Sequence, residues 1–351
     1  MIEDKDLRVA VQRGLITESQ AAGLTAIADA RRNAREGVEP GEEPFVLFKG
    51  FNEIFVVIGL VILFSGWIGV SAAFGAEILN PGGLDTILIA AVTLAGLGFV
   101  QRYFTIKRRM IAPSMALAIM TAFTAAVLGW ALANELGLSG LVAHAAGAST
   151  LVAWMLYHYR VFKVPFDAAI IAGAVFWAAW SVLALAGLLP ETGSMLFRAT
   201  QGGPMAIASI VFGLICFATA MRFDMSDPHR VSTRSTTGFW LHVVAAPPIV
   251  NTIAGQLIGQ GQAAELLLLA VLVLLAVVAI VIDRRSFLIS GAGFAVWLMF
   301  SLFDGSPMVI LLLGFGLVGL GSQWDRLRGG LMNALPDFPG KDRLPPYGSP
   351  A

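Results

Sequence analysis

The sequence predicts an all-α fold: a polytopic transmembrane helix bundle of about ten spans, with its N-terminus and C-terminus in the cytoplasm. Three observations predict it. Hydrophobic residues make up 57% of the 351 residues and charged residues only 13%, whereas a soluble domain has about 25% charged residues. The apolar residues are gathered into ten long runs. Of the 23 Lys and Arg residues, 22 fall in alternate gaps between these runs.

The chain begins with two short predicted helices, at residues 4–13 and 18–32. Gly14 is suited to end the first helix, because glycine readily takes the left-handed conformation found after a helix. Thr17 and Gln20 form a capping box at the start of the second helix. Residues 1–35 are therefore predicted to form a small cytoplasmic helical hairpin.

Residues 36–52 follow as an acidic linker and an interfacial segment with several phenylalanines. A secretory signal starts with a short basic segment that leads straight into an apolar core, and this polar start has neither. We therefore expect the N-terminus to be retained and the first apolar run to be the first membrane anchor.

The membrane domain is predicted to cover residues 53–322. A bilayer core about 30 Å thick takes about 20 apolar residues in a helix, and the backbone must be helical there because lipid offers it no hydrogen-bond partner. The ten runs are 54–74, 84–101, 111–133, 138–157, 165–187, 204–221, 239–260, 264–282, 286–303 and 307–322. The short tenth run crosses a thinned patch of bilayer or is re-entrant. Ten spans also permit two inverted halves of five.

The basic residues set the predicted orientation. They lie in the N-terminal segment, in every second gap and in the C-terminal tail, and Arg198 is the one exception. Since basic residues resist translocation, the gaps that hold them are predicted to be cytoplasmic. Residues 323–351 then form a cytoplasmic amphipathic segment followed by a disordered, proline-rich tail.

The seventh run contains the main candidate site. Pro247 and Pro248 have no N–H to donate, so the carbonyl groups of Val243 and Val244 lose their helical partners. Carriers place ligands at such breaks near the bilayer midplane, and Asn251 lies one turn further along. The alternative is a plain proline kink whose carbonyl groups are satisfied by neighbouring side chains.

His144 is the second candidate. It lies among small residues in the fourth run, at a predicted depth similar to that of Asn251. An ionisable group inside a span suggests a functional site. The alternative is a neutral imidazole that hydrogen-bonds a neighbouring helix.

Other polar residues near the runs receive structural interpretations. His242 is expected at the membrane interface, and Asp167 is expected to meet Lys163 at the surface. The segment DMSDPH (224–229) offers three metal-ligand types, but an Asp-Pro turn explains it better. Cys216, the only cysteine, is expected to be an inert small hydrophobe.

No pattern in the sequence indicates catalysis. It has no phosphate-binding loop, no HExxH zinc motif, no GxSxG elbow and no paired carboxylates within a run. We therefore predict that the protein is not an enzyme and needs no cofactor or metal. The formal net charge of zero gives no reason to expect nucleic acid as a partner.

Four short segments resemble a family of uncharacterised bacterial polytopic membrane proteins. They are RGLITESQ (13–20), FKGFNEIF (48–55), FWLHVVAAP (239–247) and WDRLR (324–328). The resemblance implies a location in the bacterial inner membrane. It implies no substrate and no site residues.

Two functions follow from these patterns. The first is a carrier-like protein with a small-molecule or ion cavity at the seventh span, lined by His144, Asn251 and the carbonyl groups of Val243 and Val244. The second is a regulatory or scaffolding protein whose residues 1–35 bind a cytoplasmic protein partner. In both cases the lipid bilayer surrounds the bundle.

Overall fold

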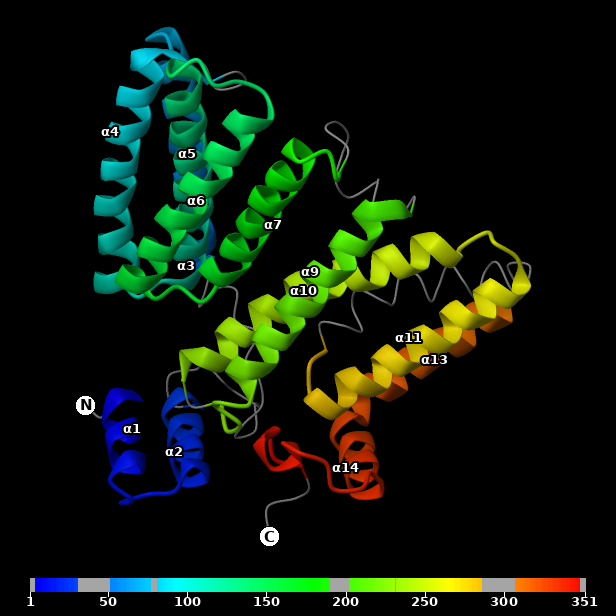
Figure 1. The fold of residues 1–351 in the computed structure, drawn as a ribbon. Helices are drawn as coiled ribbons and strands as arrows, with labels where there is room; N and C mark the ends of the chain where they lie inside the picture. The colour runs from blue at the N-terminus through cyan, green and yellow to red at the C-terminus, as the bar shows by residue number, and fades with distance from the viewer. Residues whose placement is uncertain are drawn as a thin grey trace. The chain divides into compact units, whose positions relative to one another are not determined.

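The structure is a computed structural model that describes residues 4–30, 51–76, 81–189, 202–230, 232–285 and 307–347 (Figure 1). Within these ranges the regular structure is helical. Six helices are long and apolar enough to cross a membrane, and they mark the chain as a membrane protein. They are α3 (Phe51–Ala73), α4 with its π-helical continuation η1 (Gly83–Lys107), α5 (Ile111–Glu135), α7 (Asp167–Leu185), α9 (Gly203–Asp224) and α11 (Gln262–Ile282).

Three more helices coincide with predicted spans: α6 (Leu141–Phe162), α10 (Thr233–Leu257) and α13 (Pro307–Ser322). The first two are long enough to cross a bilayer but are less apolar than the others, and α13 has only 16 residues. The ninth predicted run, 286–303, lies outside the described residues. Nine of the ten runs are therefore helices, while the count of ten spans stays a prediction.

The N-terminal hairpin contains α1 (Asp4–Gln12) and α2 (Glu18–Ala30). The predicted capping box is present: the backbone N–H of Thr17 donates to Gln20 Oε1 at 2.9 Å, and that of Gln20 donates to Thr17 Oγ1 at 3.2 Å. Gly14 has a φ of 68°, as expected of a glycine that ends a helix. Most of the linker at residues 36–52 lies outside the described residues.

The chain divides into two compact units, and each is described by itself. One contains residues 44–192; the other contains residues 1–43 and 193–351. The division falls between the fifth and sixth predicted spans. An inverted relationship between two halves of five spans stays a prediction.

Helix α3 of unit 44–192 has the polarity expected next to lipid. Its buried residues are Glu53 and Ser71, whereas Phe55, Ile62 and Leu63 are 65–71% exposed. A helix in a soluble protein would bury the large apolar side chains and expose the carboxylate. This distribution shows an apolar exterior suited to a bilayer.

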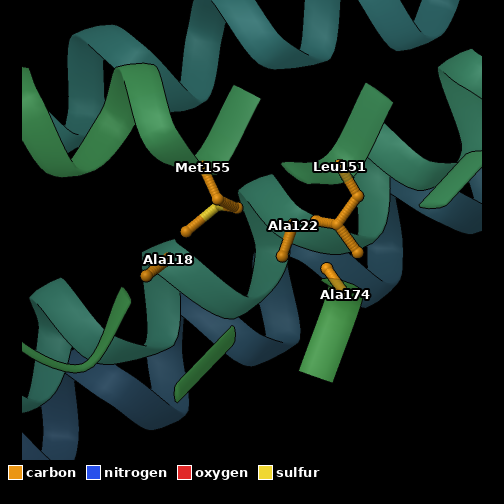
Figure 2. Packing of buried hydrophobic residues seen from close by; sticks show 5 residues of the cluster. All are labelled: Ala118, Ala122, Leu151, Met155 and Ala174. Carbon is orange, nitrogen blue, oxygen red and sulfur yellow. The ribbon is translucent and has the colours of Figure 1, made fainter. Parts of the chain in front are cut away.

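The core of unit 44–192 is built by α5, α6 and α7. Figure 2 shows Leu151 and Met155 of α6 pointing toward Ala118 and Ala122 of α5 and Ala174 of α7. Small residues bring the backbones close together. A Cβ atom added at Gly129 of α5 would lie 2.8 Å from the carbonyl oxygen of Ala146 on α6.

Polar contacts link the ends of α3, α4 and α5. Glu53, at the start of α3, accepts hydrogen bonds of 3.0–3.3 Å from the backbone N–H groups of Ile111 and Ala112. A carboxylate is favourable at a helix N-terminus such as that of α5. Elsewhere in the unit, the side chain of Asn134 donates to the carbonyl group of Pro81. Each contact joins loops that the sequence places on one side of the membrane.

The second unit is centred on α10, which packs along α9 and also contacts α11 (Figure 1). Gly213 of α9 allows the close approach, because an added Cβ would lie 2.6 Å from Ile249 Cγ1. After α13, the chain continues into the short helix α14 (Trp324–Ala334) and the 3₁₀ turn η2 (Lys341–Arg343).

Candidate functional site

The predicted break in the seventh span is not present. Helix α10 runs without interruption from Thr233 to Leu257, with Pro247 and Pro248 inside it. Each proline removes one backbone donor from the helix. The structure fits the alternative of prolines within one continuous helix, while ligand binding at this point stays a prediction.

The residues proposed at this point nevertheless share one side of α10. Val243, Val244, Pro247, Pro248 and Asn251 are all half-buried, while their neighbours Ala245, Ala246, Ile249 and Val250 are buried. Positions three and four apart lie on one face of a helix. The candidate residues therefore form a less tightly packed face, hereafter the proline face.

The other side of α10 is packed with apolar residues at the same level. Val250 and Ala254 are buried against Leu268 and Leu272 of α11. This contact is dry and apolar, so any polar ligand near Asn251 would have to use the proline face.

His144 lies in the other unit, within a cluster of tryptophans. Its ring centroid is 4.3 Å from that of Trp130 on α5, and 6.0 and 6.4 Å from those of Trp177 and Trp180 on α7. His144 Nδ1 is buried, and no described residue forms a hydrogen bond with it. Whether His144 and Asn251 share a layer stays a prediction, because they belong to separate units.

A groove of about 400 Å³ lies next to this cluster. Trp130 and Trp177 form part of its wall, together with apolar residues of α5, α6 and α7 and with Pro81. The lining is almost entirely apolar, so the groove suits hydrocarbon better than a polar solute.

Sequence reasoning missed a buried ion-pair network at one end of the second unit. Asp224 ends α9, and its Oδ2 lies 2.9 Å from Nε2 of His242 on α10. Arg284, just after α11, donates from Nε to the same oxygen at 2.9 Å and from Nη2 to Asp224 Oδ1. All three side chains are at most 3% exposed. His242 was expected at the interface, but the acid on the neighbouring helix draws it into the core.

A second set of charges extends this network toward the C-terminal segment. Arg230 donates to the carbonyl oxygen of Asp283 at 2.9 Å and forms an ion pair of 3.0 Å with its carboxylate. The indole N–H of Trp324 donates to the same carboxylate at 2.7 Å. Arg328 donates to the carbonyl groups of Pro345 and Pro346. Three predicted cytoplasmic segments therefore converge at one end of the unit.

Burial and neighbouring charges act on these groups in opposite directions. Burial raises the pKa of Asp283, but the Arg230 and Arg328 guanidinium groups and the Trp324 hydrogen bond more than offset it, so the pKa lies below its usual value. Burial lowers the pKa of Arg284 to about 9. Both groups are therefore charged at neutral pH.

A second buried acid–imidazole pair lies in unit 44–192. Nδ1 of His158, near the end of α6, lies 2.7 Å from Oδ2 of Asp167 at the start of α7. The predicted partner of Asp167, Lys163, is exposed, and it ends α6 in the left-handed conformation with a φ of 54°. The loop 163–166 thus turns Asp167 inward, which sequence spacing alone did not indicate.

Two acidic residues of the segment 224–229 make contacts with other protein groups. Asp224 is turned into the network described above, and Asp227 accepts hydrogen bonds from the backbone N–H and the hydroxyl group of Ser232. Among the residues that the structure describes, no group of three His, Cys, Asp or Glu side chains is arranged to hold a metal ion.

Comparison with protein-family models, with curated proteins and with solved structures finds no match. The proposal of a function therefore depends on the sequence and the geometry of this chain.

The Asp224 network yields a prediction at Gly238 of α10. A Cβ atom at this position would lie 2.3 Å from Asp224 Oδ1, so Gly238→Ala should push the carboxylate away from its partners. We expect a loss of about 1–3 kcal/mol of folding free energy, the usual cost of overpacking. Thermal unfolding of the purified chain in lipid nanodiscs measures it.

Gly173→Ala is the control. No described atom lies within 4 Å of a Cβ added at this exposed position in α7, so the higher helix propensity of alanine should leave stability equal or slightly raised. Equal melting temperatures for the two variants would contradict the tight packing of Asp224.

Proposed function

We propose that this chain is a carrier-like multi-pass protein of the bacterial inner membrane, with both termini in the cytoplasm, which moves a small molecule or an ion. The observation that carries the proposal is the buried His158–Asp167 pair between two apolar helices. Buried ionisable groups are costly, and this pair, at the helix ends beside the predicted cytoplasmic loop 163–166, suits an entry point for an ion or a proton. The resemblance described above supports the location.

The proline face of α10 is the proposed ligand-binding surface in the second unit. It presents the Asn251 amide and the carbonyl groups of Val243 and Val244, which have lost the helical donors at positions 247 and 248. A solute that gives and accepts hydrogen bonds could use both. We also place His144 on the pathway, as the polar group beside the apolar groove of the other unit.

Uptake by vesicles tests the carrier function. The purified full-length chain is reconstituted, and amino acids, sugars, nucleosides and small inorganic ions are offered as separate probe sets. The vesicle contents are then measured by mass spectrometry. We expect uptake of at least one probe above empty vesicles, and a reduction of at least about tenfold in a Pro247→Ala, Pro248→Ala variant. Tenfold corresponds to about 1.4 kcal/mol on a rate.

Pro204→Ala is the matched control, because Pro204 lies in the first turn of α9, where a missing N–H costs nothing. It should transport like the unaltered chain. No uptake of any probe set would count against the carrier function. Normal uptake by the double variant would remove the proline face from the pathway.

A second function is favoured by the surface of the N-terminal hairpin. Leu15 is 72% exposed, and Val9 and Leu24 are 43% and 48% exposed. The hairpin buries Leu7, Ala21 and Ala22 instead. Apolar side chains that stay exposed on so small a hairpin suit the binding of another protein. We propose residues 1–35 as a docking element for a cytoplasmic protein in a regulatory or scaffolding role.

Deletion of residues 1–35 tests this role. Affinity purification after cross-linking should lose a cytoplasmic protein that the full chain captures, and a Leu15→Glu, Val9→Glu variant should lose the same protein while the hairpin stays folded. If every captured protein is retained by the deletion variant, the docking role is excluded.

A further inference from the structure

The His158–Asp167 pair is sealed inside unit 44–192. The side chains are 3% and 0% exposed, and 2.7 Å separates His158 Nδ1 from Asp167 Oδ2. The Phe162 ring lies beside His158, with 4.6 Å between the ring centroids. Both side chains are almost fully buried, so a charge on either is costly unless it is balanced locally.

The second polar atom of each side chain has no hydrogen-bond partner among the residues that the structure describes. These atoms, His158 Nε2 and Asp167 Oδ1, are both buried. Buried polar atoms are almost always hydrogen-bonded, and those that are not often have a functional role. The Nε2 lone pair of a neutral His158 imidazole can accept a proton.

Within the described part of the chain, no arginine or lysine forms an ion pair with Asp167, whose contact is with His158. Arg160 and Lys163 at the end of α6, and Arg102 and Lys107 on η1, are exposed. Asp167 lies in the first turn of α7, whose N-terminus offers a partial positive charge. That partial charge stabilises the anion but does not replace a full countercharge.

The Asp224–His242 pair is the internal comparison. It has the same imidazole–carboxylate contact, 2.9 Å long, but Arg284 donates to both carboxylate oxygens. With a neutral imidazole, this group has a net charge of zero. The His158–Asp167 pair with a neutral imidazole has a net charge of −1, and only a further proton brings it to zero.

We propose that the His158–Asp167 pair is a proton-binding site that takes up and releases one proton. In the unloaded state the Nδ1–H group of a neutral imidazole donates to the carboxylate. Loading adds a proton to the Nε2 lone pair, and the resulting imidazolium neutralises the carboxylate; release reverses this single N–H bond formation. The role of this proton as the coupling ion of a carrier rests on the proposed function. The binding of a proton at this pair does not.

Nitrogen NMR of histidine side chains tests the site. The chain has four histidines, so ¹⁵N-histidine labelling of the full chain in nanodiscs gives a spectrum that single His→Gln substitutions can assign. Spectra are recorded over a measuring window of about pH 5 to 8. We expect the His158 signal to show two protonation states, with and without the Nε2 proton. The His242 signal is the comparison, because Arg284 already balances the charge of Asp224.

Asp167→Asn supplies the decisive comparison, because it keeps the shape but removes the negative charge. A doubly protonated His158 would then be an isolated buried cation, so we expect that form to disappear from the whole window. Should this variant not fold, Asp167→Glu serves instead, and it should retain the proton step. A His158 signal with one protonation state at every pH, or an unchanged step in Asp167→Asn, overturns the proposal.

The two proposals fail separately. A titrating His158 in a chain that takes up no solute would leave the proton site intact and remove the carrier. Uptake without a titrating His158 would leave the carrier and remove the proton site.

Discussion

The ion pair between Asp224 and Arg284 is the interaction on which the second unit depends. It joins the end of α9 to the residues that follow α11, and through His242 it includes α10. A carboxylate and a guanidinium group buried among apolar helices would each be very costly alone. Together they hold three helix ends at fixed positions, and Arg230, Asp283 and Trp324 extend this arrangement to the C-terminal segment.

The same constraint explains why the two acid–imidazole pairs differ. Where an arginine is present, the charges cancel and the pair is a structural link. At His158 and Asp167, where the described residues supply no arginine partner, we propose that a movable proton provides the balancing charge. The surroundings are apolar in both units, and in α3 the large apolar side chains face outward while Glu53 is turned inward. A bilayer would make each uncompensated charge still more costly.

The sequence predicted the helices well, because each apolar run has the length of a bilayer core and lipid leaves the backbone only helical hydrogen bonds. Thr17 and Gln20 could be placed because a capping box is local. The Asp224–His242–Arg284 network could not, because its members lie up to 60 residues apart. A usable signal was present: Asp224 and His242 lie near the ends of two runs that flank one loop. The break expected at Pro247 is absent, since packing against neighbouring helices such as α9 and α11 lets a membrane helix continue past a proline.

The central claim is that the basic segments lie together on the cytoplasmic side of a membrane. Cysteine labelling in intact cells tests it directly, since replacing Cys216 leaves a cysteine-free chain. Single cysteines at the exposed positions Arg108, Arg285 and Glu135 are treated with a membrane-impermeant maleimide. The account predicts labelling at Glu135 alone until the cells are opened, and at all three positions afterwards. Labelling of Arg108→Cys but not Arg285→Cys in intact cells would contradict it.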